Sequence, residues 1–175
     1  MTFAQRLVGA MMLDARVYED IEANPSATWQ AALVVLLSSL AAGIGTEGGG
    51  FEARALIVGT LGGFVGWVSW AALIYLLGTH LLPEPQTQAD VGELLRTLAF
   101  AASPGILRLA GVVPALGWLT FAGTSVWMLA AMVVAVRQAL DYRSSSRAIT
   151  VCALGWMLSL AVAAVIGIFF PATVS

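Results

Sequence analysis

The sequence predicts an all-α membrane protein, a bundle of five transmembrane helices preceded by a short amphipathic interfacial helix. Composition is the first reason: 59% of the 175 residues are hydrophobic and only 10% are charged, whereas soluble domains carry about 25% charged residues. The second reason is that the apolar residues form runs of about 20, the length that a helix needs to cross a bilayer. A soluble domain, a disordered chain and a disulfide scaffold are therefore excluded.

The first segment differs from the rest in its periodicity. Residues 1–25 are expected to form the amphipathic helix and a linker, and residues 26–175 the five-span transmembrane domain. Between positions 2 and 22, apolar residues such as Phe3 and Leu7 recur about every 3.5 positions, and charged residues mostly take other faces. This spacing indicates one helix on the membrane surface. A short helix that packs on the bundle is an equally good interpretation.

Four of the five spans are continuous apolar runs. They cover residues 27–44, 55–82, 115–140 and 148–170. At 1.5 Å per residue, even the shortest of these helices reaches about 27 Å, which is close to the hydrocarbon thickness. The second span is longer than needed, so it should tilt or protrude.

The third span, residues 91–113, is interrupted. Only eleven uncharged residues separate Arg96 from Arg108, so a full crossing must accept Arg108 at membrane depth. Pro104 removes a backbone donor and should kink the helix. A re-entrant or broken helix is the alternative. The spacing of Asp90 and Glu93 matches a capping box and predicts that a helix begins there.

The charged residues predict an orientation and exclude several classes of protein. With the N-terminus inside, six of the eight arginines lie on the inner side and only Arg54 and Arg108 on the outer side. The positive-inside rule then places the N-terminus in the cytoplasm and the C-terminus on the opposite side.

A net charge of −2 argues against nucleic-acid partners. With one Cys, one His and no catalytic motif, we expect no enzyme activity, no cofactor and no metal site.

Small residues recur at four-residue spacing in two spans. Such stripes let helices approach closely in a membrane, where apolar lipid gives no hydrophobic drive between helices. The two stripes could face each other, which we favour, or could form an oligomer interface. The helix-packing candidates are Gly59, Gly62, Gly63 and Gly66 in the second span and Gly155, Ser159, Ala163 and Gly167 in the fifth.

The candidate functional polar residues lie in and around the third span: Arg108, Ser103, Pro104, Glu93 and Arg96. Ionisable groups within a membrane are functional hypotheses by default. Glu93 and Arg96 are three residues apart and could pair at the surface. Arg108 could contact an anion or a lipid headgroup, pair with an outer-loop glutamate (Glu47 or Glu52), or extend to the nearer surface.

Three segments resemble the Yip family of polytopic membrane proteins. They are Asp14–Pro25 before the first span, Leu94–Pro104 in the third, and Arg137–Ala148 before the last. The resemblance implies a five-span bundle with a cytoplasmic N-terminus. Eukaryotic relatives bind Rab-type GTPases, but their Asp-Leu-Tyr-Gly-Pro motif is missing here, so a Rab-type partner is not expected. Arginine without lysine suits a bacterial member in the cytoplasmic membrane.

Two functions are compatible with this sequence. The first is a non-enzymatic scaffold or accessory subunit of a membrane protein complex or of membrane organisation, with membrane lipids and other integral membrane proteins or a second copy as partners. The alternative is a small transporter or channel that uses the Pro-kinked third span and Arg108. We favour the scaffold because transporters usually need paired charges at mid-membrane depth.

Overall fold

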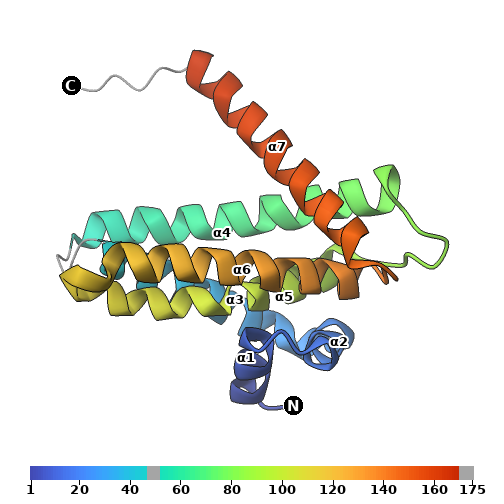
Figure 1. Ribbon diagram of the computed structural model, residues 1–175, viewed down its shortest axis with the longest axis horizontal. Coiled ribbons are helices and arrows are strands. Elements are labelled where there is room, and N and C mark those ends of the chain that lie inside the picture. Colours follow the sequence, from blue (N-terminus) through green and yellow to red (C-terminus); the bar gives the residue numbers. More distant parts are fainter. Residues whose placement is uncertain (47–51, 170–175) are drawn as a thin grey trace.

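The structure is a computed structural model that describes residues 1–46 and 52–169, and this part of the chain is helical without a strand (Figure 1). Glu47 and the end of the chain lie outside the described residues. The elements are α1 (Phe3–Met11), α2 (Ala15–Ala23), η1 (Pro25–Ala27), α3 (Thr28–Thr46), α4 (Ala53–Leu76), η2 (Leu77–Leu81), α5 (Val91–Ala101), η3 (Ser103–Val112), η4 (Pro114–Leu116), α6 (Gly117–Ala139) and α7 (Ser145–Phe169).

Four helical segments are long and apolar enough to cross a membrane. They are Pro25–Gly45, Ala53–Leu81, Gly117–Ala139 and Ser145–Val162. Each overlaps one of the four continuous runs predicted from the sequence, because an uncharged run of this length satisfies its backbone hydrogen bonds only as a helix. An all-α membrane protein is therefore confirmed.

The third predicted span forms two helices of different kinds. α5 begins at the predicted capping box: the Asp90 carboxylate accepts from the Glu93 N–H at 2.8 Å, and the Glu93 carboxylate accepts from the Asp90 N–H at 2.7 Å. The α-helix ends at Ala101, and the tighter 3₁₀ segment η3 follows with Pro104 in its first turn. Pro104 has no N–H to continue the α-helical pattern, so the segment breaks rather than bends.

The α5–η3 segment runs parallel to α3. The Ser38 hydroxyl donates to the Ala102 carbonyl at 2.8 Å. Further along both elements, the backbone of Gly45 lies against the carbonyl of Arg108, where a Cβ on Gly45 would overlap it. This is a position where only glycine fits, and it lets η3 lie directly on α3.

The N-terminal segment differs from the single surface helix that its periodicity predicts. It forms two helices, α1 and α2, separated by a turn in which Leu13 has a φ of 61°. Arg6, which periodicity places on the polar face, is only 2% exposed. Its Nε donates to Asp20 of α2 at 2.8 Å and its Nη1 to Gln30 of α3 at 2.9 Å. Because Asp20 of α2 neutralises Arg6 of α1, both helices can pack on the bundle.

The last helix leaves the bundle. The first half of α7 packs beside α4 and α6, and its second half diverges from them (Figure 1). The helix begins at Ser145, and the Ser144 hydroxyl accepts from the Ser146 N–H at 3.1 Å. Ser144 therefore caps the start of α7.

The N-terminal helices are fastened to α5 by Arg96, which is 7% exposed. Its guanidinium donates to the Ile21 carbonyl at 3.2 Å and to the Glu22 carbonyl.

We expect Arg96→Met to lower the unfolding free energy by about 2 kcal/mol, because both carbonyls lose a charged donor. Thermal unfolding in detergent measures the change. Arg16→Met is the matched control, since the Arg16 side chain is 86% exposed; an equal loss in both variants would contradict this role.

Candidate functional site

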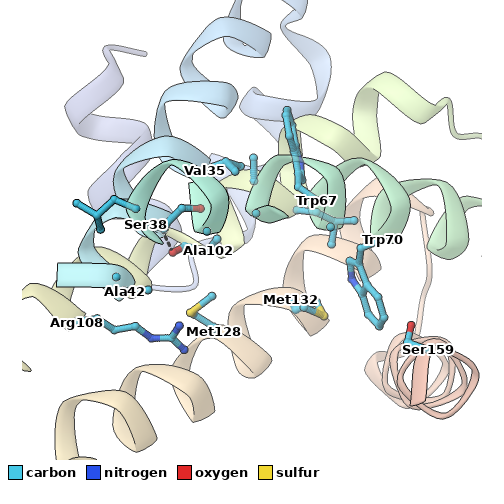
Figure 2. A pocket seen from close by; sticks show the side chains of 18 of the residues that line it. Val35, Ser38, Ala42, Trp67, Trp70, Ala102, Arg108, Met128, Met132 and Ser159 are labelled. Atoms are coloured by element: carbon cyan, nitrogen blue, oxygen red, sulfur yellow. Dashed lines mark hydrogen bonds between the residues drawn. The ribbon is translucent and has the colours of Figure 1, made fainter. Parts of the chain in front are cut away.

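A cavity of about 610 Å³ is recessed between the helices and opens at the surface of the bundle, and we call it the central cavity. Its walls come from α3, α4, α5, η3, α6 and α7, so elements from most of the chain meet there (Figure 2). Most of the lining is apolar, with two methionines of α6, Met128 and Met132, on one wall. A cavity of this size falls within the range of about 300–1,000 Å³ typical of small-molecule sites.

Arg108 is the charged residue of this lining. Its Nε donates to the Thr124 hydroxyl at 3.1 Å and its Nη2 to the Ser125 hydroxyl at 2.8 Å. The guanidinium carbon also lies 4.5 Å from the centre of the Phe121 ring, within the distance of a cation–π interaction. Three residues of α6 therefore hold the guanidinium at one end of the cavity.

The Arg108 side chain extends sideways to α6 and not toward the end of the bundle. Thr120 of α6 lies beside Gly111 at the end of η3, whereas Arg108 bonds Thr124, one turn deeper. The predicted pair with Glu52 is not formed among the described residues, and Glu47 lies outside them.

Tryptophans occupy the opposite end of the central cavity. The Trp67 indole donates to the Leu95 carbonyl at 2.9 Å and ties α4 to α5. Trp70 of α4 and Trp156 of α7 pack with ring centres 5.7 Å apart. The Trp70 indole N–H is buried and finds no acceptor among the described residues. In Figure 2, Trp70 and Ser159 lie away from Arg108, with the two methionines between them.

The other candidate polar residues lie outside the cavity lining. Ser103 and Pro104 are buried at the start of η3, and the Ser103 hydroxyl has no partner among the described residues. Glu93 caps α5, while Arg96 bonds carbonyls of α2. The expected ion pair between Glu93 and Arg96 is absent from the described contacts, because each side chain has a better-placed backbone partner.

The glycines of α4 divide into packed and open positions. Gly63 lies against Ser39 of α3, so a side chain there would overlap the serine. Gly59 and Gly66 line the central cavity and have open space before them. Gly62 also faces open space but does not line the cavity. Only part of this stripe is therefore used in contacts between helices of this chain.

In α7, Gly155 is the packed member of the stripe: a Cβ would meet the Trp70 ring at 2.9 Å. Ser159 lines the central cavity. The surroundings of Ala163 and Gly167, further out along α7, fall outside the described part of the structure.

Sequence reasoning did not identify the α6 residues that hold Arg108. The signal was present: Thr120, Thr124 and Ser125 place hydroxyls on one side of an otherwise apolar helix. Such hydroxyls usually bond the carbonyl one turn back, as Thr124 does with Thr120 at 2.7 Å. Their oxygens still accept a second hydrogen bond, and Arg108 donates it.

These features define a class, that of helical integral membrane proteins with several apolar helices long enough to cross a membrane. A family model described as the Yip1 domain matches residues 10–166, so the chain belongs to the Yip family. The resemblance found in the sequence is thereby confirmed. The comparisons with curated proteins and with solved structures gave no match.

Outside the spans, Glu22 at the end of α2 has a shifted pKa. Burial, together with the nearby carboxylates of Asp141, Glu93 and Glu19, raises the pKa of Glu22 to about 7, while Arg96 acts in the opposite direction. Because the folded pKa lies above the unfolded value of 4.5, folding favours the protonated form. This stabilisation is complete below the unfolded pKa and is lost as pH rises through the folded pKa.

We therefore expect the unfolding temperature in detergent to fall between about pH 5 and about pH 8. Glu22→Gln should flatten this dependence, because the amide does not ionise. Glu52→Gln, an exposed acid before α4, should keep the full slope. A Glu22→Gln variant with an unchanged slope would show that another group is responsible.

Proposed function

We propose that the protein is a non-enzymatic scaffold or accessory subunit that holds another integral membrane protein in the bacterial cytoplasmic membrane. Membership of the Yip family and the apolar helices support the membrane setting. The observation that carries the proposal is the divergence of α7 from its own bundle (Figure 1). A helix that leaves its neighbours offers its surface to a helix of a different protein.

The divergence opens a second hollow of about 500 Å³, the α4–α7 cleft, which is lined by Gly66, Ser69, Trp70, Leu73, Leu158, Ser159 and Val162. Gly66 and Ser159 contribute small residues from both helices. Small residues let a partner helix approach the backbone, which is the main source of helix association in lipid. Within the cleft lining, Leu158 is 46% exposed and Val162 is 50% exposed.

We also propose that the chain crosses the membrane five times, with its N-terminus in the cytoplasm. The eleven residues of α5 and the ten of η3 span about 36 Å at their respective rises, more than the hydrocarbon core of about 30 Å. The parallel course of α3 and α5–η3 supports a crossing in the same direction. This arrangement puts Arg137, Arg143 and Arg147 on the cytoplasmic side.

The second candidate is a small transporter or channel, and the central cavity with Arg108 is the observation in its favour. The broken third segment is also a feature of transporter sites. The scaffold remains the better-supported function, because Arg108 is fixed by neutral hydroxyls and has no described carboxylate that could exchange with a solute ion. Loss of a solute flux in Arg108→Leu, with partners still bound, would favour the transporter.

The scaffold is tested by photo-crosslinking in native membranes. A photoreactive phenylalanine analogue at Leu158, which lines the α4–α7 cleft, should give one protein adduct of defined mass, because a partner helix packs into this cleft. In a second arm, Ser159→Ile should reduce recovery of that partner at least about fivefold by blocking close approach, and Ser159→Ala should not. Lipid adducts alone, or equal recovery with both variants, would contradict the scaffold.

A further inference from the structure

The central cavity holds a positive charge without a counter-charge. Thr124 and Ser125 are neutral, and their hydroxyls already donate to carbonyls of α6 at 2.7 Å. The third guanidinium nitrogen, Nη1, has no partner among the described residues, and no described carboxylate lies within ion-pair distance of Arg108. A charge at membrane depth is unfavourable unless it is paired or solvated.

The guanidinium is also held in position. Two of its nitrogens are bonded to α6 and its plane lies near the Phe121 ring, so the remaining edge is fixed in direction. In Figure 2 the Arg108 side chain extends along the wall of the cavity toward Met128. A planar fork of N–H donors held in this way matches the oxygens of a phosphate, which accept two parallel hydrogen bonds.

Beyond Arg108 the cavity is suited to a hydrocarbon chain. Gly59 and Gly66 leave open space along the α4 wall. Met128 and Met132 on the α6 wall have flexible thioether side chains, which adapt to chains of irregular shape. The cavity thus has one cationic end and a long apolar remainder.

We propose that the central cavity binds an anionic phospholipid, with its phosphodiester at Arg108 and part of an acyl chain between the Gly59 and Met128 walls. The α4–α7 cleft adjoins this cavity and shares Gly66, Trp70 and Ser159 with it, but Arg108, Gly59 and Met128 lie outside the cleft lining. The lipid proposal therefore does not depend on the proposed scaffold function. The charge of the phosphate supplies the counter-charge that Arg108 lacks. Binding would then fill the space between six elements of the fold.

The mostly apolar lining favours a lipid over other anions. Free phosphate would use the cationic end and leave the apolar walls unfilled, and a small hydrophilic ion gains nothing from them. An amphiphile satisfies both ends at once.

Tryptophan fluorescence provides the test, because Trp67, Trp70 and Trp156 line the cavity. Phosphatidylglycerol with brominated acyl chains, added to the full-length protein in non-ionic detergent, should quench this fluorescence with saturation at one lipid per chain. Arg108→Gln should weaken this binding about tenfold through loss of the charged hydrogen bonds. Arg54→Gln, which changes the other outer arginine, should not.

A pair of glycine variants tests the same site without altering Arg108. Gly59→Leu should weaken quenching at least about fivefold by filling the cavity, whereas Gly62→Leu on the same helix should have no effect. Both glycines face open space, so both variants should fold. This pair decides the question if Arg108→Gln fails to fold.

Three results would overturn the proposal. The first is equal quenching by brominated phosphatidylcholine, whose headgroup is zwitterionic. The second is displacement of the brominated lipid by inorganic phosphate, which would indicate a site for the free anion. The third is unchanged binding in Gly59→Leu.

Discussion

The break between α5 and η3 controls the arrangement of the bundle. In a continuous α-helix, Pro104 could not donate to the carbonyl one turn before it. The chain instead ends α5 at Ala101 and continues as a 3₁₀ helix, while the Ala102 carbonyl accepts from Ser38. The narrower η3 then lies directly against α3 at Gly45. From this position it directs Arg108 sideways onto α6.

The placement of Arg108 illustrates how this fold treats charge. Arg6 and Arg96 are buried, whereas Arg108 is half-buried. Arg6 and Arg96 lie beside α1 and α2 and are satisfied there, by a carboxylate for Arg6 and by backbone carbonyls for Arg96. Arg108 has only hydroxyls and an aromatic ring around it. The first two charges therefore hold the N-terminal helices in place, and the third remains available to a ligand.

The sequence predicted the features that depend on local chemistry. The lengths of the continuous apolar runs predicted four spans, and the spacing of Asp90 and Glu93 predicted the start of α5. Pro104 marked the site of the break, although composition alone did not show that η3 would be a 3₁₀ helix. The division of the N-terminal segment was missed because it depends on Arg6 meeting Gln30, 24 residues away. Thr124 and Ser125, which accept hydrogen bonds from Arg108, were missed for the same reason, because they lie on another helix.

The most direct test of this account asks whether the broken segment crosses the membrane. Single cysteines replace Gln88 before α5 and Val113 after η3, both exposed, in a chain where Cys152 is changed to Ser. A membrane-impermeant thiol reagent is then applied to intact cells and to inside-out vesicles. We predict that position 113 reacts only in cells and position 88 only in vesicles. Reaction of both positions from the same side would show a re-entrant segment and contradict the account.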